Sequence, residues 1–191
     1  MTVKEVTTKK ERREFFRFPL KLYKGNAYAV PQLISDENDE FNPAINDAYS
    51  YAESKMFLCY DDNGKVVGRI AAILNKAYNA KQNVKQLRFS RYDVIDDFAV
   101  TEALFEPVKK WAEELGMDEI VGPIGFSDLD KQGMLIEGFD RDAMYLTIYN
   151  YPYYAGHMER LGMQKSADWV EYRIAVPTEP DEPFLKSMVP R

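Results

Sequence analysis

A β-hairpin is the clearest local structure in this chain, in the stretch SKMFLCYDDNGKVVGRIAAILN (residues 54–75). Ser54–Tyr60 and Lys65–Asn75 are rich in apolar residues, and each run has the length of a strand. The residues between them end in Asn63-Gly64, a pair that readily adopts the positive φ angles of a tight hairpin turn. We therefore predict two neighbouring antiparallel strands here.

Strands and one long helix alternate on the C-terminal side of the hairpin. After a polar, turn-rich segment, Leu87–Ile95 predicts a third strand beside the hairpin. Apolar residues then recur at helical spacing until Gly116 ends the helix, and Pro107 either kinks this helix or begins its second half. The apolar helical positions are Val100, Leu104, Val108, Trp111 and Leu115, and further extended segments are predicted at Met117–Gly125, Tyr145–Tyr149 and Asp168–Val176.

On the N-terminal side of the hairpin, the sequence predicts a strand, a helix and an irregular segment that covers the domain. Val3–Val6 is strand-like, and Thr8 with Glu11 forms a capping box that starts a helix. Pro19 predicts that this helix ends by Phe18. Residues 18–34 are aromatic, apolar and irregular, so they should pack over the body, and the acidic residues 36–40 predict an exposed turn. The fold class is mixed α/β, with a largely antiparallel sheet flanked by helices.

Length, charge and composition limit the classes of function. The 191 residues are enough for one core, and we predict a domain over residues 1–176 followed by a Pro-rich tail or truncated linker over 177–191. The net charge of -6 argues against a duplex nucleic-acid partner, which requires a basic face. No run of 18 apolar residues and no signal-like N-terminus is found, so we expect a soluble cytoplasmic protein with no membrane partner. The lone Cys59 is interpreted as an apolar filler in a strand.

The predicted order of elements resembles the GCN5-related N-acetyltransferase (GNAT) fold over about residues 2–176. The phrases FPLKLYKGN (18–26), GPIGFSD (122–128), GMLIEGF (133–139) and YNYPYY (149–154) resemble a little-characterised bacterial branch of that superfamily. The resemblance implies transfer of an acyl group from acetyl-CoA or another acyl-CoA to an amine. It also implies that the strands on either side of the long helix splay apart, with the pantetheine in the gap. Ile95, Phe98, Asn150 and Tyr153 are the residues expected to contact the acyl-CoA.

Two family features are altered in this sequence. The segment Ile95–Glu102 holds no glycine, although the family's diphosphate-binding loop at the helix start relies on glycine amides. Asp96 and Asp97 in that segment are better suited to capping the helix. Met158 also takes the place of the tyrosine that protonates the departing thiolate in the family. Tyr154, one turn earlier, replaces that acid if the last helix begins at Pro152, and Tyr153 is then expected to face away.

Asp93 is the candidate base, and several other polar residues are candidates for substrate binding. By the two-residue period of a strand, Asp93 should share a face with Phe89 and Arg91. The alternative is a structural pair between Asp93 and Arg91 or Arg88 of a neighbouring strand. Phe126, Ser127 and Asp128 follow a strand end, and Glu137 is either a buried base with a raised pKa or an exposed loop residue. His157 is the only histidine and has no neighbouring ligands, so no metal is expected.

Two functions from different classes follow from these residues. The first is a GNAT-like acyltransferase with Asn150, Tyr153 and Tyr154 lining the acyl site. The second is a GNAT-like fold that has lost catalysis and binds a small molecule or pairs with another domain. A homodimer, or a second domain that supplies the missing parts, remains a further alternative.

Overall fold

The computed structural model describes residues 1–142 and 147–174, and it contains one five-stranded sheet in the order β1-β2-β3-β4-β5. Neighbouring strands are antiparallel except for β4 and β5, which are parallel. The strands are β1 (Thr2–Glu5), β2 (Ala52–Tyr60), β3 (Val66–Asn75), β4 (Gln86–Val94) and β5 (Glu119–Val121). The helices are α1 (Lys9–Leu22), α2 (Ile34–Glu40), the 3-10 helix η1 (Asp47–Ser50), α3 (Lys76–Gln82), α4 (Phe98–Glu114) and α5 (Tyr153–Arg160).

The predicted hairpin is confirmed as β2 and β3. The Asp61 carboxylate accepts hydrogen bonds from the backbone amides of Asn63 and Lys65, at 3.0 and 2.8 Å. Gly64 has a φ of +76°, in the left-handed region that glycine adopts at no steric cost. These bonds close the turn and set the register of both strands.

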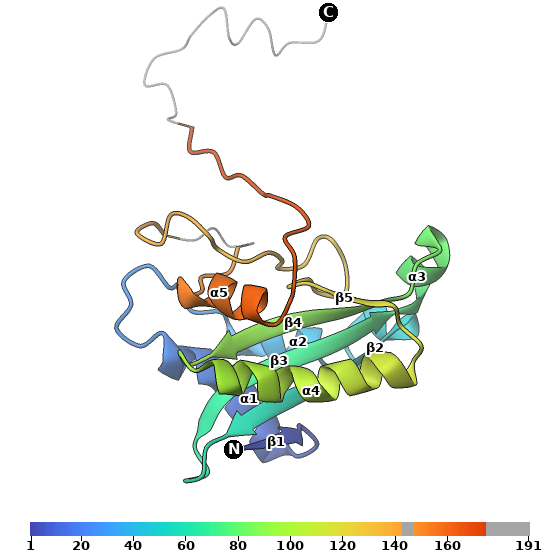
Figure 1. Cartoon of the computed structure of the whole chain (residues 1–191), viewed down its shortest axis with the longest axis horizontal. Helices are drawn as coiled ribbons and strands as arrows, with labels where there is room; N and C mark the ends of the chain where they lie inside the picture. The colour runs from blue at the N-terminus through green and yellow to red at the C-terminus, as the bar shows by residue number, and fades with distance from the viewer. Residues whose placement is uncertain (143–146, 175–191) are drawn as a thin grey trace, which may run out of the picture.

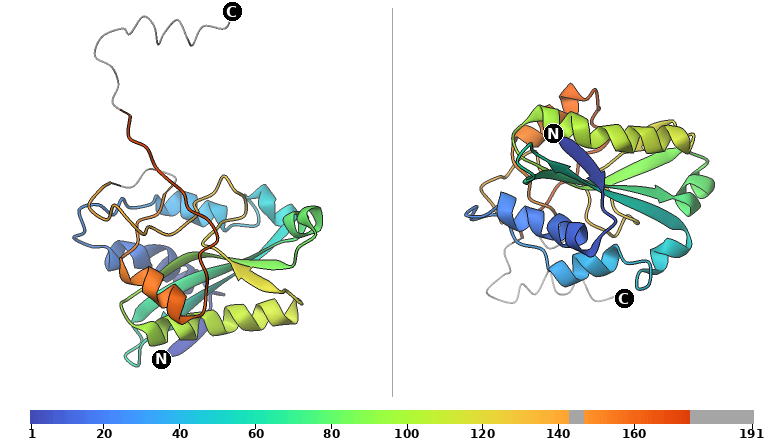
Figure 2. Two further views of the ribbon diagram at one scale, coloured as in Figure 1. Left: turned by 45° about the horizontal axis from the view of Figure 1, so that its top comes forward. Right: turned by 90° about the horizontal axis from the view of Figure 1, so that it is seen from below.

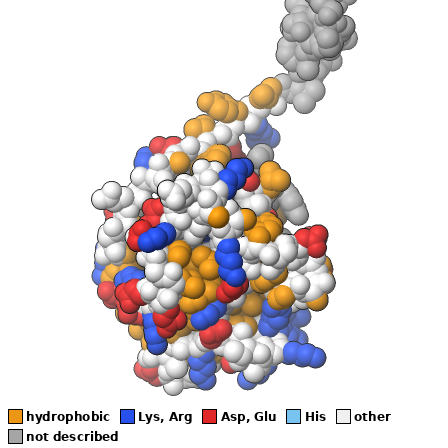
Figure 3. All heavy atoms as spheres, turned by 90° about the vertical axis from the view of Figure 1, so that its right-hand side faces the viewer, with side chains coloured by type: hydrophobic (Ala, Val, Ile, Leu, Met, Phe, Trp, Pro, Cys, Tyr) orange, Lys and Arg blue, Asp and Glu red, His pale blue; other side chains and the backbone are white. Residues whose placement is uncertain are grey.

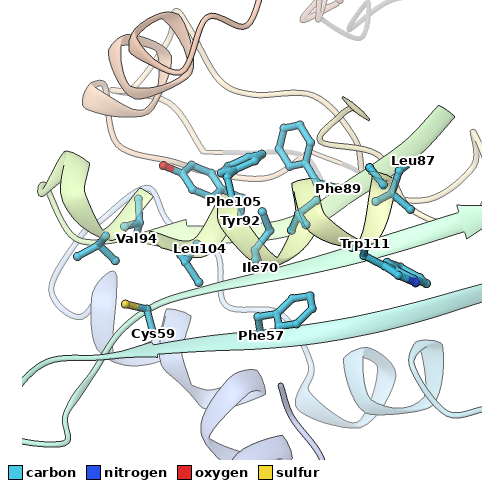
Figure 4. Close-up of a cluster of buried hydrophobic side chains, with 14 of the residues drawn as sticks. Phe57, Cys59, Ile70, Leu87, Phe89, Tyr92, Val94, Leu104, Phe105 and Trp111 are labelled. Atoms are coloured by element: carbon cyan, nitrogen blue, oxygen red, sulfur yellow. The ribbon is translucent and has the colours of Figure 1, made fainter. Parts of the chain in front are cut away.

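The sheet is covered on both faces, as Figure 2 shows: α4 lies on one face, and α1 and α2 lie on the other. Under α4 is the larger core, to which the strands contribute side chains such as Phe57, Ile70 and Phe89 (Figure 4). Under α1 and α2 is a second core that includes Phe15 and Phe41. The central strands β3 and β4 are therefore buried on both sides, which places the polar groups on them in a low-dielectric environment.

The predicted capping box at the start of α1 is confirmed, but the predicted end of this helix is wrong. The Glu11 amide donates to the Thr8 hydroxyl, and the Glu11 carboxylate accepts from the Thr8 amide. Pro19 lies inside the helix, which continues to Leu22. Proline has no N–H to offer the carbonyl of Phe15, and the Arg69 guanidinium donates to that carbonyl instead, at 3.0 Å. This substitute donor keeps the buried carbonyl satisfied.

The acidic segment 36–40 is not an exposed turn, as the sequence predicted, but part of helix α2. Its residue Glu37 is 3% exposed and makes ion pairs with Arg91 and Lys131. Both partners lie far from Glu37 in the sequence, so the acidic residues around Glu37 gave no sign that its side chain is buried.

The C-terminal strands are shorter or absent compared with the prediction. β5 covers only Glu119–Val121, and residues 122–125 of the predicted strand lie outside it. Neither 147–149 nor 168–174 forms a strand, and the rest of both predicted strands and the predicted tail lie outside the described residues. Residues 169–174 project from the body with exposed apolar side chains (Figure 3). These are Trp169, Val170, Tyr172 and Ile174.

Candidate active site

The gap between β4 and β5 opens after only three paired residues on each strand. β4 pairs with β5 over Gln86–Arg88, and α5 lies beside the remaining C-terminal end of β4 (Figure 1). The amide of Val94 in β4 donates to the Tyr154 hydroxyl at 2.9 Å, and the Tyr153 hydroxyl donates to the Val94 carbonyl at 2.7 Å. The tyrosines of α5 therefore satisfy the backbone at the open end of β4.

Tyr153 does not face away, as the sequence predicted. The last helix does begin after Pro152, which is its N-terminal cap residue. Tyr154 is 1% exposed and Tyr153 is half-buried, and both hydroxyls reach the same β4 residue. A hydroxyl at the end of a long aromatic ring reaches the strand from either of two adjacent helical positions.

A chain of buried hydrogen bonds leads from Tyr154 to an ion pair between neighbouring strands. The Tyr154 and Tyr23 hydroxyls are 3.0 Å apart, and the Tyr23 hydroxyl donates to Asp93 Oδ1 at 2.8 Å. Asp93 Oδ2 accepts from Arg69 Nε at 2.7 Å, and both of these side chains are 5% exposed. Burial, and after it the charge of Asp93, raises the pKa of both tyrosines well above its ordinary value. Both phenols are therefore protonated at neutral pH.

Asp93 lies on the α1 face of the sheet, because a β-bulge changes the alternation of β4. Arg91 has a φ of +50°, and the register of β3 and β4 shifts at this point. Asp93 and Arg91 share the face, but Phe89 packs on the opposite face under α4, so that part of the prediction is wrong. Asp93 pairs with Arg69, its register partner on β3, and not with Arg91 or Arg88.

A second cluster of buried charges lies beside this ion pair. Arg91, 3% exposed, is held by Glu37 at 2.6 Å and by Glu40, and Lys131 donates to the other oxygen of Glu37 at 2.8 Å. A cavity of about 30 Å³ lies between these groups and the chain of hydrogen bonds. Its lining includes Glu37, Arg69, Asp93, Lys131, Asn150 and Tyr154. The cavity has room for one small polar group.

Glu37 gives the fold a defined dependence on acid. Burial raises its pKa, but the charges of Arg91, Arg69 and Lys131 outweigh burial and lower the pKa from 4.5 to about 2. A group with a lowered pKa stabilises the fold above the unfolded value, and this contribution is lost as the pH falls from 4.5 towards 2. We expect a loss of about 3 kcal/mol in the free energy of unfolding over that range. Urea unfolding at a series of pH values measures it.

The matched variants for this acid dependence are Glu37→Gln and Glu114→Gln, since Glu114 is exposed on α4. Glu37→Gln should flatten the dependence in this pH range, whereas Glu114→Gln should leave it as in the wild type. An equally steep loss of stability in Glu37→Gln would contradict the assignment.

Asn150 and the other candidate substrate-binding residues lie in different settings. Asn150 is 5% exposed and bonds both backbone groups of Leu135, at 2.6 and 3.0 Å, so it fixes the loop that covers the cavity. Phe126 is part of the core under α1 and α2. Ser127 is half-buried, with an amide that donates to Asp130, and Asp128 and Glu137 are exposed. Only Asn150 of this group lines the cavity.

The N-terminus of α4 is closed by its own cap. The Asp97 carboxylate accepts from the Ala99 amide at 3.0 Å, which confirms the capping prediction for Asp97. Half-buried Ile95 leads into this cap from β4, and half-buried Phe98 follows it. The Arg160 guanidinium of α5 stacks on the Phe98 ring at 3.7 Å. One cation therefore lies beside the helix start that lacks glycine.

His157 is buried next to the same helix. Its Nδ1 is 2.9 Å from the hydroxyl of Thr101, which in turn is 2.7 Å from the Tyr92 hydroxyl. Burial lowers the pKa of His157, so it is neutral at pH 7. Within residues 1–142 and 147–174, no three acidic, histidine or cysteine side chains lie close enough to share a metal ion, and no helix has the length and apolar character to cross a bilayer.

Comparison with known proteins identifies the architecture. The acetyl transferase from Pyrococcus furiosus superposes with a TM-score of 0.52 and 16% sequence identity, over 91% of this chain and 99% of that one. The chain has the fold of the GCN5-related N-acetyltransferases. The GNAT fold predicted from the sequence, with its mixed and largely antiparallel sheet, is thereby confirmed.

Two curated bacterial proteins are similar in sequence to this GNAT-fold chain. Protein YghO of Escherichia coli (strain K12) is 27% identical over 187 residues, which are 98% of this chain and 47% of that protein. The bacterial ceramide synthase of Caulobacter vibrioides is 29% identical over 175 residues, which are 91% of this chain and 45% of that protein. The chain thus spans about half the length of these relatives. None of the protein families compared with the chain matches it.

Sequence reasoning missed Tyr23, Arg69, Glu37 and Lys131 as members of the site. One signal was present for Arg69, which interrupts the apolar run of β3, since a charge in a buried strand requires a partner. Glu37 and Lys131 lie in polar segments and gave no such signal.

Proposed function

We propose that this chain is an acyltransferase that moves an acyl group from an acyl-CoA to an amine. The acyl-CoA is a substrate that the reaction consumes. The observation that carries the proposal is the position of Tyr154: its hydroxyl lies at the open end of β4 and is linked through Tyr23 to the buried carboxylate of Asp93. An acid and a base within one polar network are what amide formation from a thioester requires.

In this proposal the thioester lies beside Val94, and Tyr154 protonates the departing thiolate. Asp93 takes a proton from the amine, which enters the small cavity between Asp93 and Glu37. The cavity is lined by two carboxylates, of Glu37 and Asp93, and by three cationic side chains, of Arg69, Arg91 and Lys131, so its walls are polar and can hydrogen-bond an amine. Arg69 holds Asp93 in place through the 2.7 Å contact between Nε and Oδ2.

The diphosphate of the acyl-CoA would not be bound by the amides of a glycine-rich loop, as it is in the family. The side chain and the carbonyl of Asp97 already accept from the Ala99 and Val100 amides at the α4 N-terminus, so fewer backbone donors are free there. Arg160, stacked on Phe98 beside this terminus, is the cation positioned for a phosphate. Arg160 of α5 would therefore pair with the diphosphate at this end of the site, in place of backbone amides.

The acceptor we propose is a long-chain amine. The relative from Caulobacter vibrioides is named a bacterial ceramide synthase, and a ceramide is an amide of a long-chain amino alcohol. The cavity is polar and holds only a small group, so the amino group of such a molecule, and not its chain, would enter it. The complete activity belongs to the proposal, because the chain spans about half of that relative.

One observation favours the second candidate function, a binding module without catalysis. The segment Ile95–Glu102 has no glycine, and the hydroxyls of Tyr153 and Tyr154 already occupy the backbone of Val94. A ligand that pairs with β4 at this residue must displace them. Binding and turnover therefore have to be measured separately.

Thermal unfolding with acyl-CoA tests the donor site. At a ligand concentration of about 100 times the dissociation constant, binding to the folded state adds about 2.7 kcal/mol, which raises the midpoint by about 5–10 °C. We expect this shift with palmitoyl-CoA and a smaller one with coenzyme A alone. Equal midpoints with and without palmitoyl-CoA would contradict the donor site, and Arg160→Gln should reduce the shift if this residue binds the diphosphate.

A further inference from the structure

We propose that Tyr23 relays a proton from Asp93 to Tyr154, and so connects the base for the amine with the acid for the thiolate. This inference rests on the proposed acyl transfer. In it, Tyr23 touches neither reactant and acts only through Asp93 and Tyr154. A single hydrogen-bonded chain would then move one proton from the nucleophile to the leaving group within the buried site.

The direction of the hydrogen bonds follows from counting protons. The carboxylate of Asp93 has no proton, so the Tyr23 hydroxyl donates to it at 2.8 Å. The single proton of Tyr23 is thereby used, so Tyr154 is the donor in the 3.0 Å contact between the two hydroxyls. The alternative acceptor, the Val94 carbonyl, is farther away at 3.3 Å and already accepts from Tyr153. The Tyr154 oxygen in turn accepts from the Val94 amide at 2.9 Å. The resting chain thus runs from the backbone of β4 to the Asp93–Arg69 ion pair.

The reaction balances in atoms and protons along this chain. The neutral amine nitrogen attacks the thioester carbonyl, a C–N bond forms, the C–S bond breaks, and the nitrogen loses one proton to Asp93. The two hydroxyls first rotate, so that Tyr23 donates to Tyr154 and Tyr154 donates to the thiolate. Asp93 then passes a proton to the Tyr23 oxygen, the Tyr23 proton moves to the Tyr154 oxygen, and the Tyr154 proton moves to the thiolate. The products are an amide and a free thiol, and the transferred protons leave the chain in its resting orientation.

Burial and packing hold Tyr23 in the position that a relay needs. Its ring packs edge-on against Tyr149 at 5.7 Å and lies 5.1 Å from Tyr151, with ring centroids as the reference points. Arg69 donates to Oδ2 of Asp93, which leaves Oδ1 directed at the Tyr23 hydroxyl. The raised pKa values of the tyrosines are compatible with this scheme, because neither phenol has to ionise when its proton is replaced as it leaves.

The test compares Tyr23→Phe with Tyr151→Phe, using palmitoyl-CoA and the long-chain amino alcohol sphinganine. Tyr151 lies in the same aromatic group, but its hydroxyl donates to the Leu22 carbonyl outside the relay. We expect Tyr23→Phe to lower kcat by about 100-fold with an unchanged KM for palmitoyl-CoA, and Tyr151→Phe to keep kcat within about threefold of wild type. In mixtures of H2O and D2O the wild-type proton inventory should be curved, and that of Tyr23→Phe should be linear.

A measurement without turnover tests the hydrogen-bonded chain itself. Buried hydroxyl protons exchange slowly enough to be seen by NMR, and Tyr23→Phe should remove the Tyr23 signal and shift that of Tyr154. An unshifted Tyr154 signal, or a Tyr23→Phe variant with wild-type kcat, would overturn the relay. Absence of turnover in the wild type would instead overturn the proposed function, and the relay with it, so the two failures are distinguishable.

Discussion

Replacing Arg69 by Met is expected to lower the free energy of unfolding by about 3–5 kcal/mol, because the substitution leaves a buried carboxylate without its cation. Asp93 is 3% exposed, so bulk solvent does not take the place of the guanidinium. The same substitution removes the donor that satisfies the Phe15 carbonyl, whose usual helical partner is absent at Pro19. Urea unfolding followed by circular dichroism measures the change.

The matched control for Arg69→Met is Lys76→Met. Lys76 also pairs with a carboxylate, that of Glu53, but both side chains are more than half exposed. Removing this cation should change the stability by less than about 1 kcal/mol. The double variant Arg69→Met/Asp93→Leu should recover part of the loss, since it removes the unpaired charge. Similar effects for the buried and the exposed cation would show that Asp93 is not held by Arg69.

Tyr154→Phe is expected to lower kcat by about 10²–10⁴-fold, the usual contribution of a positioned acid. The phenyl ring keeps the packing against Tyr92, whose ring centroid is 5.1 Å away, and removes only the hydroxyl. Release of free thiol from palmitoyl-CoA in the presence of sphinganine measures the rate. The shift of the unfolding midpoint with palmitoyl-CoA should remain, because donor binding does not need the proton.

The control for this loss is again Tyr151→Phe, whose hydroxyl lies outside the chain that leads from Val94 to Asp93. A Tyr154→Phe variant with wild-type kcat would remove Tyr154 from the mechanism and favour a water molecule as the proton source. Loss of both binding and turnover would instead assign Tyr154 a role in forming the donor site.

Local patterns in the sequence predicted the local parts of the fold. Asn63-Gly64 predicted the hairpin turn, Thr8 with Glu11 predicted the start of α1, and Asp97 predicted the cap of α4. Each pattern depends on residues within four positions of one another, so neighbouring side chains decide the outcome. The GNAT fold then followed from the order of the elements.

The parts that the sequence did not predict depend on contacts between distant residues. Glu37 is buried because it meets Arg91, 54 residues later in the chain. Asp93 faces α1 because the bulge at Arg91 reverses the alternation of β4, and a two-residue period cannot reveal a bulge. Tyr23 enters the site through a segment that looked like irregular cover. These long-range contacts decide which of the candidate residues share one network.

Mass spectrometry of the products is the most direct test of acyl transfer by this chain. The protein is incubated with palmitoyl-CoA and sphinganine, and with each reactant alone. The proposed function predicts the palmitoyl amide of sphinganine together with an equal amount of free coenzyme A, and only when both reactants are present. Intact palmitoyl-CoA and no amide after many equivalents of protein and time would contradict it.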